Sequence, residues 1–385
     1  MKKVGVLAFA NIHTGGVLQY TQTLIEALNE GSGENYKLVV FTFKDCTFDS
    51  GNAEVRVVKK PNTGYFKKSI IMAQLFFNLK KKWGLSKDEI LKFNGIDLFF
   101  NPTISLYPNF YLNTPFIFTL HDFQERYYPK NFSKVDRITR WLMKKTLSNS
   151  AQHIICESNY VKEDILNFLR TEESMVSVVP SPPVKLFSDF CFYKNEASKV
   201  KLKYSLPDQY IFYPAQFWIH KNHIRLIHAF SELIKKNPEL HLVITGVKEN
   251  NYWRVIETIK LLNVEDKVLH LGYVDQKNLP YIYKMSKLLV MPTLFESISV
   301  PIYEAFSIGV PVCSSNVVAL PEQTNGGALL FNPKDTKDIE NKIQKVLSDS
   351  SLQEELIRRG RLVIDNLDNN KYAASIIKIV LKFLK

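Results

Sequence analysis

Short apolar runs alternate with longer amphipathic segments along nearly the whole chain. Continuous apolar runs of about four to eight residues are typical of strands that are buried on both faces of a parallel sheet. Amphipathic segments between such runs are typical of the helices that connect parallel strands. The pattern therefore predicts an α/β protein built from βα units.

The N-terminal half contains seven of these apolar runs. We predict strands at Val4–Ala10, Lys37–Phe43, Glu54–Val58, Ile96–Phe100, Phe116–Leu120, His153–Cys156 and Val176–Val179. Helical periodicity predicts helices at Val17–Asn29, Tyr65–Lys82, Ser133–Leu147 and Asn159–Leu169. Strands and helices in this order predict a doubly wound parallel sheet.

A second series of strands begins at Tyr210. We predict strands at Tyr210–Pro214, Leu240–Thr245, Val268–Leu271, Leu288–Met291, Val310–Ser314 and Ala328–Phe331. Asn222 is suited to cap a helix whose apolar positions are Ile224, Ile227, Phe230 and Ile234. A second parallel α/β domain is therefore expected.

The boundary between the two series falls at Pro180-Ser181-Pro182-Pro183, which interrupts regular structure. A chain of 385 residues is also longer than one hydrophobic core usually serves. We predict a domain over residues 1–182, a linker region over 183–208 and a second domain over 209–368. A last helix within 369–385 can pack on either domain, including back on the N-terminal one.

The net charge of +12 favours anionic partners such as phosphates, acidic lipid surfaces or nucleic acid. Nucleic acid is not expected, because the sequence has no helix-turn-helix, zinc-finger or RNP-type signature. The four cysteines, Cys46, Cys156, Cys191 and Cys313, have neither a disulfide-framework nor a zinc-ligand spacing. This cysteine usage fits a reducing cytosol.

The N-terminus has two features of a signal peptide, Lys2-Lys3 followed by the apolar run Val4–Ala10. The run is short for that purpose and leads into a turn that ends at Gly15-Gly16, so we interpret it as a buried first strand. No apolar stretch approaches the roughly 18 to 20 residues that a membrane span requires. We expect a cytoplasmic protein.

The most informative motif lies between the strand Leu288–Met291 and the helix that Pro301 helps to start. The loop residues Ser297, Ile298, Ser299 and Val300 present backbone N–H groups at this helix N-terminus, which predicts an anion site suited to a phosphate. Glu296 can accept hydrogen bonds from sugar hydroxyls, and Glu304 can accept two from a ribose diol. For an isolated pair of this kind, two solvated acids favouring a helix N-terminus are the alternative.

The pair is accompanied by further motifs. These are Gly309-Val310-Pro311-Val312, Leu320-Pro321-Glu322 and Gly327-Ala328-Leu329-Leu330-Phe331-Asn332-Pro333. With them, the segment from Phe295 to Pro333 closely resembles the donor-site region of glycosyltransferase family 4. The resemblance covers nearly the whole chain and is strongest from Tyr210 onward.

This resemblance implies the GT-B fold, in which two Rossmann-like domains face a cleft. The N-terminal domain would lie on the acceptor side, and the C-terminal domain would bind a nucleotide-sugar donor. The implied reaction is transfer of the sugar with retention of anomeric configuration to a glycan or lipid-linked acceptor, in cell-surface polysaccharide synthesis. It would need no cofactor besides the nucleotide-sugar co-substrate, and no metal is expected.

The resemblance also implies roles for the motif residues. Glu296 would contact the donor sugar, Glu304 the ribose, and the amides from Ser297 to Val300 the diphosphate. The family more often has glycine at the positions of Ser297 and Ser299, which leaves open how closely the backbone approaches the phosphates.

A second motif follows the strand Tyr210–Pro214. Lys221 stands at a strand-to-helix turn, where its charge can neutralise a diphosphate leaving group, and it matches the family's phosphate-binding lysine. The arginine that is common five residues earlier is Gln216 here. Whether His220, Gln216 or another lysine or arginine takes the place of that arginine is open. The plain alternative for Lys221 is a surface lysine without a function.

Two candidates come from the N-terminal half. Gly15-Gly16 lies between the first strand and helix Val17–Asn29, where glycines permit close approach of a ligand. The pair alone indicates only a tight turn, but the family has a Gly-Gly loop here that faces the donor phosphates. His121 follows the strand Phe116–Leu120 and matches the family's active-site histidine. We expect it to position donor or acceptor rather than to act as a nucleophile.

Weaker candidates rest on the same comparison. Gly246 ends a strand near the expected nucleotide, and Gly272-Tyr273-Val274 resembles the segment that contacts the base. Ordinary turns explain these equally well. The chain contains no Asp-x-Asp sequence, which agrees with transfer that needs no metal.

Basic residues recur on one predicted helix beside Trp141, at Lys134, Arg137, Arg140, Lys144 and Lys145, and Lys67, Lys68 and Lys80–Lys82 flank another. Such faces suit peripheral binding to an anionic membrane, on the inner face, and a solvated surface is the alternative. Two other functions stay open. One is another GT-B enzyme, such as a nucleotide-sugar epimerase or a phosphorylase, and the other is a two-lobed sugar-binding protein.

Overall fold

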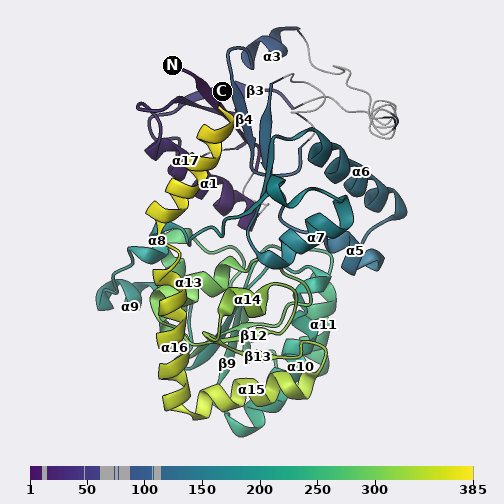
Figure 1. The fold of residues 1–385 in the computed structure, drawn as a ribbon. Coiled ribbons are helices and arrows are strands. Elements are labelled where there is room, and N and C mark those ends of the chain that lie inside the picture. The colour runs from purple at the N-terminus through teal and green to yellow at the C-terminus, as the bar shows by residue number, and fades with distance from the viewer. Residues whose placement is uncertain are drawn as a thin grey trace. The chain divides into compact units, whose positions relative to one another are not determined.

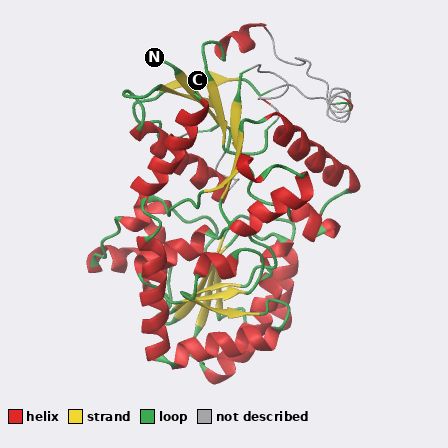
Figure 2. Cartoon of the chain, in the orientation of Figure 1, coloured by secondary structure: helices red, strands yellow, loops and turns green. Residues whose placement is uncertain are grey.

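The computed structural model describes residues 1–10, 15–46, 48–60, 73, 77, 87–105, 107 and 114–384. These residues form two compact units, Met1–Ser181 with Asp368–Lys385, and Pro182–Leu367. Each unit has a parallel sheet in its interior and helices outside it (Figures 1 and 2). The predicted α/β class with two doubly wound parallel sheets is confirmed.

The first unit contains a seven-stranded sheet in the order β3-β2-β1-β4-β5-β6-β7. Its strands are β1 Lys3–Ala8, β2 Lys37–Phe43, β3 Glu54–Val58, β4 Leu98–Asn101, β5 Phe116–Thr119, β6 His153–Cys156 and β7 Val176–Val178. All neighbouring pairs are parallel, as in Val4 beside Leu38 and Leu98. The order reverses between β1 and β4, and this reversal is where such sheets bind ligands.

Helices cover the first sheet on both faces. They are α1 Gly16–Glu30, α3 Lys87–Lys92, α5 Gln124–Tyr127, α6 Lys134–Ser150, α7 Asn159–Leu169 and α17 Asn369–Phe383, with short 3₁₀ turns at Pro129–Asn131 and Glu173–Met175. Alternate residues of β1 belong to separate cores, since Val4 and Val6 pack with α1 whereas Leu7 packs on the other face. The predicted helix Tyr65–Lys82 lies outside the described residues, apart from positions 73 and 77.

The C-terminal helix α17 packs beside α1 (Figure 1). Its inward positions Ala373, Ile376 and Val380 are buried in the same core as Leu24 and Leu28 of α1. These positions recur at helical spacing, so one apolar face accounts for the packing. The last helix therefore belongs to the first unit.

The second unit contains a six-stranded sheet in the order β10-β9-β8-β11-β12-β13. Its strands are β8 Tyr210–Pro214, β9 His241–Thr245, β10 Val268–His270, β11 Leu288–Met291, β12 Val312–Ser315 and β13 Ala328–Phe331. Its helices are α8 Lys185–Ser188, α9 Lys194–Lys203, α10 His223–Lys236, α11 Tyr252–Leu261, α12 Leu279–Met285, α13 Val300–Ile308, α14 Leu320–Thr324, α15 Thr336–Ser348 and α16 Ser350–Asp365, with 3₁₀ turns at Ile219–Lys221 and Gln276–Asn278. The strand order reverses between β8 and β11.

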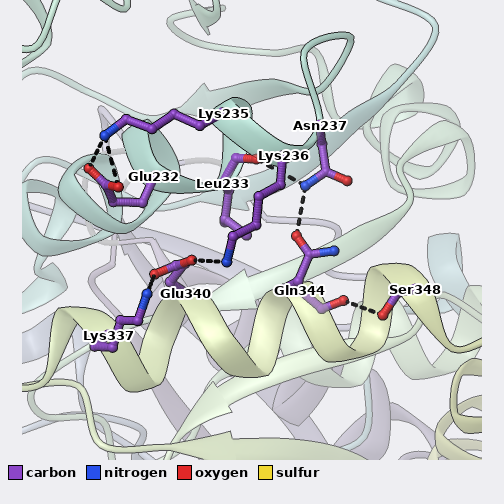
Figure 3. A network of polar contacts seen from close by, with 9 residues as sticks. All are labelled: Glu232, Leu233, Lys235, Lys236, Asn237, Lys337, Glu340, Gln344 and Ser348. Carbon is purple, nitrogen blue, oxygen red and sulfur yellow. Dashed lines mark hydrogen bonds and ion pairs between the residues drawn. The ribbon is translucent and has the colours of Figure 1, made fainter.

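Two helices on one side of this sheet are joined by a polar network (Figure 3). Lys236 at the end of α10 and Lys337 of α15 donate to the two oxygens of Glu340, at 2.8 and 2.7 Å. Asn237 donates to Gln344 Oε1 at 2.7 Å. Because the Glu340 carboxylate is buried, two cationic partners offset the cost of removing it from water.

The segment 183–208, which we expected to link the domains, contains the helices α8 and α9. Phe187, Val200 and Leu206 from this segment are buried in the core of the second unit. Its many charged residues hid this apolar spacing, because they occupy the exposed side of α9. Among the described residues, no helix is both long and apolar enough to cross a membrane.

Candidate active site

The strongest candidate site lies at the reversal of strand order in the second unit. Strands β8 and β11 are neighbours in the sheet, so the loops that follow them leave the same edge side by side. The first loop carries Lys221 and the second carries Glu296. In doubly wound sheets, this crevice at the carboxyl ends of the strands is the usual ligand site.

Backbone contacts hold these two loops together. The carbonyl of His220 accepts from the amide of Leu294 at 2.7 Å and from the hydroxyl of Thr293 at 3.2 Å. The carbonyl of Lys221 accepts from the buried hydroxyl of Tyr213 at 2.6 Å. The backbone on both sides of the Lys221 side chain is therefore fixed before any ligand binds.

Asn222 contributes to this fixation in a way that its sequence context did not predict. It does occupy the N-cap position of α10, but in the left-handed region with φ of 62°. Its side chain donates to the carbonyls of Pro292 and Pro333, each at 2.8 Å. The prediction that the side chain caps the helix is therefore wrong: Asn222 instead ties the loops after β8, β11 and β13 to one another.

Lys221 and Glu296 form an ion pair across the two loops. Both side chains are largely but not completely buried, at 17% and 18% exposure, so the pair has access to solvent. A lysine ammonium has three N–H donors, and Glu296 Oε2 takes one of them. Donors remain for phosphate oxygens while the carboxylate still holds the lysine in place.

The other candidates for positive charge here differ from Lys221. Burial lowers the pKa of His220 to about 3, assisted by the charge of Lys221, so His220 is neutral at physiological pH. Gln216 accepts a hydrogen bond from the indole of Trp218 at 2.9 Å. Arg225 places a guanidinium in this region and donates to Asn222 Oδ1 at 2.9 Å. His220 therefore does not replace the charge that Gln216 lacks.

The predicted anion-binding loop precedes α13, with Ser299 at the N-cap position. Ser297, Ile298 and Val300 lie on the same turn into the helix. The amide of Ser299 already donates to Gln323 Oε1 at 2.9 Å, and Gln323 Nε2 donates back to the Ser299 carbonyl at 2.8 Å. One of the four candidate amides is therefore occupied by a side chain of α14.

Glu304 lies on α13 and is only 2% exposed. One of its oxygens accepts from the hydroxyl of Tyr283 on α12, at 2.6 Å. Burial and the neighbouring carboxylate raise the pKa of Tyr283 well above its usual value, so the phenol keeps its proton and remains a donor. A ribose that binds Glu304 must compete with this buried hydrogen bond.

The glycines after β9 and β10 have backbone conformations that favour glycine whether or not a ligand binds there. Gly246 has φ of 130°, and a Cβ there would lie 2.3 Å from the carbonyl oxygen of Ala215. Its amide donates to the carbonyl of Gly272 at 3.0 Å. Beside Gly272, Tyr273 is exposed and Val274 is buried. The Tyr273 side chain is accessible to a ligand at this edge, whereas only the backbone of Val274 can serve one.

In the first unit, Gly15 precedes α1 with φ of 55°, and Gly16 begins the helix. Both glycines are exposed. His121 follows β5, two strands from β1 in the same sheet. The three residues thus lie at the carboxyl edge of one sheet, where a parallel sheet binds ligands.

His121 is held by a set of polar contacts within the first unit. Its Nδ1 lies 2.9 Å from Glu157 Oε2, and its Nε2 lies 2.9 Å from the carbonyl oxygen of Pro102. The other oxygen of Glu157 accepts from the Ser181 hydroxyl at 2.6 Å. The ring also packs edge-on against Tyr20 of α1, at 4.8 Å between ring centroids.

Only the N-terminal part of the predicted basic face of α6 is exposed to solvent. Lys134, Arg137 and Arg140 are exposed. Lys144 is fully buried, donating to Glu125 at 2.6 Å and to the carbonyl of Asp122 at 2.7 Å. Lys145 donates to the carbonyl of Leu169. The two C-terminal lysines of this stripe therefore stabilise the fold, and Lys67, Lys68 and Lys80–Lys82 lie outside the described residues.

Four residues that support these sites were not singled out by sequence. They are Tyr283, Gln323, Glu157 and Ser181, each of which bonds a predicted site residue or its partner. The first two lie in helices and the last two follow strands, so no local pattern distinguishes them. Glu157 gave one usable signal, an acidic residue directly after the buried strand His153–Cys156.

Comparisons with known proteins identify the family and the fold. A model described as Glycosyltransferase Family 4 matches residues 14–182, and one described as Glycosyl transferases group 1 matches residues 194–363. A sucrose-phosphate synthase from Thermosynechococcus elongatus superposes with a TM-score of 0.78 at 18% identity, over 99% of both chains. The Anabaena protein HepE, solved with UDP and glucose, superposes with a TM-score of 0.76 at 16% identity, also over 99% of both chains.

Two relatives found by sequence have a higher identity to this chain than these solved structures do. An O-antigen chain mannosyltransferase B from Escherichia coli is 29% identical over 66% of this chain and 67% of its own length. The serotype-specific mannosyltransferase WbdA from Escherichia coli is 26% identical over 54% of this chain, a match that spans only 26% of that longer protein.

The two Rossmann-like units have the GT-B fold, and both family models describe glycosyltransferases. The chain belongs to glycosyltransferase family 4, with the group 1 domain as its C-terminal half.

Proposed function

We propose that this glycosyltransferase takes mannose from a nucleotide-linked donor and adds it, with retention and without a metal, to a growing polysaccharide. The sugar and the product class are supported by the relatives named for mannose transfer and O-antigen synthesis. The nucleotide is supported by a structural neighbour solved with UDP. The acceptor is a glycan or a lipid-linked glycan.

The Lys221–Glu296 pair is the observation that carries this proposal. As the bond between sugar and diphosphate breaks, negative charge grows on the leaving phosphate, and a cation already held in place stabilises it without reorganisation. The N-terminus of α13 adds amide donors and the positive end of its dipole. Metal independence is the expected consequence of this reading, because the protein itself supplies the positive charge that the diphosphate requires. Retention is what the resemblance to the family implies.

A donor screen tests the proposal. Thermal stability is measured with mannose and with glucose, each carried on GDP and on UDP, together with the bare nucleotides. A ligand at a hundred times its Kd stabilises a protein by about 2.7 kcal/mol. We expect a mannose nucleotide to stabilise the enzyme and to be hydrolysed slowly without acceptor. Stabilisation by glucose nucleotides alone would overturn the choice of mannose.

We also propose that the start of α6 binds an anionic membrane surface. Lys134, Arg137 and Arg140 recur every three residues, and Val135, Ile138 and Trp141 follow each of them by one position. All six side chains are exposed. The apolar side chains suit the lipid interface, and each cation near an anionic surface contributes about 1 kcal/mol.

Co-sedimentation with vesicles tests this surface. We expect binding to vesicles that contain phosphatidylglycerol, weaker binding at high salt, and no binding to neutral phosphatidylcholine. The substitution Arg137→Glu with Trp141→Ser should abolish binding. As a matched control, Lys199→Glu changes an exposed lysine on α9 and should leave binding unchanged. Equal binding by the α6 variant would contradict the assignment.

A further inference from the structure

The contacts of His121 fix its protonation. A backbone carbonyl oxygen only accepts hydrogen bonds, so Nε2 must carry a proton to bond Pro102. Nδ1 faces Glu157 Oε2 at 2.9 Å, and a proton must lie between these two atoms as well. The other Glu157 oxygen is occupied as an acceptor from Ser181. The ring and the carboxylate therefore share one proton in the hydrogen bond between them.

The charges around the ring decide where that proton resides. Burial acts to lower the pKa of His121, but the hydrogen bond and charge of Glu157, the Pro102 carbonyl and the charge of Asp122 outweigh it, so the pKa is raised. The titratable groups that face the ring are Glu157 after β6, Asp122 next along the chain and Tyr20 of α1. Tyr20 has its pKa raised by burial and stays neutral. These contacts therefore make the His121 ring hold its proton more strongly than a free imidazole does.

We infer that Glu157, itself held by Ser181, is a positioning residue that keeps His121 as a fixed cation, so that His121 acts through its charge and shape and not as a base. A base needs a nitrogen lone pair directed at the acceptor hydroxyl, and both ring nitrogens of His121 face protein oxygens at 2.9 Å instead. The part of this inference that concerns sugar transfer rests on the proposed function. The protonation state does not.

One substitution isolates the charge of Glu157. Glu157→Gln keeps the side-chain size but removes the negative charge, which lowers the histidine pKa. At neutral pH, more of the rings then become neutral. The rate of transfer at one pH does not separate a cation from a base, because a histidine base also loses activity without its carboxylate partner. The protonation state of the ring and the direction of the pH profile do separate them, since a base gains activity as pH rises and a cation loses it.

The direct test is a histidine titration by ¹H–¹⁵N NMR on the full chain without ligand. The His121 signals are assigned by their loss in His121→Gln. We expect wild-type His121 to show the nitrogen shifts of an imidazolium at pH 7. In Glu157→Gln its pKa should fall by about 1 to 3 units, the usual effect of losing an adjacent opposite charge. Glu173→Gln, which removes an exposed partner of Lys162 in the same unit, should leave it unchanged.

Activity profiles add a second readout. The value of kcat/KM should decline on the alkaline side as His121 loses its proton, and Glu157→Gln should move this decline to lower pH. Ser181→Ala should produce a smaller move in the same direction. If Glu157→Gln does not fold, the wild-type nitrogen shifts and Ser181→Ala still decide. A neutral His121 at pH 7, or a pKa that the folded Glu157→Gln variant leaves unchanged, would overturn the inference. Absence of sugar transfer alongside an imidazolium His121 would contradict only the proposed function.

Discussion

The histidines at the ligand-binding edges of the two sheets have pKa values shifted in opposite directions. In the first unit His121 pairs with a carboxylate, and its pKa is raised. In the second unit His223 is buried and His220 is partly buried next to Lys221, and desolvation lowers the pKa of each to about 3. His223 stacks on Phe217, at 4.5 Å between ring centroids. The partner, and not the residue type, therefore decides the direction in which the pKa of each imidazole is shifted.

This difference has a consequence for the donor site. Because His220 and His223 are neutral, Lys221 supplies the positive charge of its loop, and its charge helps to keep them neutral. In the first unit, Glu157 offsets the charge of His121 locally. In the second unit the positive charge of this loop lies on one lysine, and Glu296 pairs with it.

The largest expected effect is the loss of that lysine. Lys221→Ala should lower kcat by roughly two orders of magnitude or more, because charge develops on the leaving diphosphate, and should weaken ground-state donor binding less. His220→Gln, one residue away, should lower kcat by less than about tenfold, since His220 carries no charge to lose. Steady-state kinetics of both variants checks the comparison. Equal losses would mean that the charge is not concentrated on Lys221.

The next effect concerns the buried carboxylate of α13. Glu304→Gln should weaken nucleotide binding by about 1 to 3 kcal/mol if the carboxylate takes a ribose diol, because a charged acceptor is lost. Titration calorimetry with the bare nucleoside diphosphate measures this. The control Tyr283→Phe removes the bond to Glu304 but keeps its charge. Unchanged nucleotide affinity in Glu304→Gln would assign Glu304 to the core alone.

The pH dependence of stability should have opposite signs at the two edges. The folded pKa of His223 lies below its ordinary value of 6.5, so its contribution is present above pH 6.5 and is lost as pH falls toward 3. Each such group changes the free energy of unfolding by up to about 1.4 kcal/mol per pH unit. His223→Phe should therefore flatten the acid decline of the second unit.

For His121 the folded pKa is raised, so its stabilisation is complete below pH 6.5 and is lost as pH rises through the folded pKa. Urea denaturation from pH 4 to 9 of wild type, His223→Phe and His121→Gln separates the two. If His223→Phe shows the full acid decline, the neutral state of His223 does not account for it.

The smallest expected effect is that of the glutamine that holds the donor loop. Gln323→Met removes the two hydrogen bonds to Ser299 at similar side-chain length and should cost about 0.5 to 1.5 kcal/mol for each bond. The Kd of the donor should rise by less than in Glu304→Gln, because the loop before α13 is released while its amide donors remain. Gln344→Met, which breaks the bond to Asn237 in Figure 3, should lower stability without changing the donor Kd. An unchanged donor Kd in Gln323→Met would show that the loop before α13 does not contribute to donor binding.

Sequence was a good guide to the sheets and a poorer one to the contacts within the sites. Apolar runs placed β5 and β11 within one residue, and Pro301 correctly indicated the start of α13, because these signals are local. The pairing of Lys221 with Glu296 depends on the strand order, which brings together loops that are 75 residues apart. The roles of Asn222 and Lys144 were misread for the same reason, since their partners lie at distant positions in the chain.

The product of the first turnover tests the central claim most directly. The enzyme is incubated with a nucleotide-linked mannose, a mannan-type acceptor and excess chelator, and the anomeric configuration of the newly formed bond is read by NMR before any equilibration. If Lys221 and the α13 N-terminus supply the charge that the diphosphate needs, transfer proceeds in chelator. The resemblance to the family predicts in addition that the product keeps the donor's configuration. An inverted product, or activity that returns only when a divalent metal is added, would contradict the account.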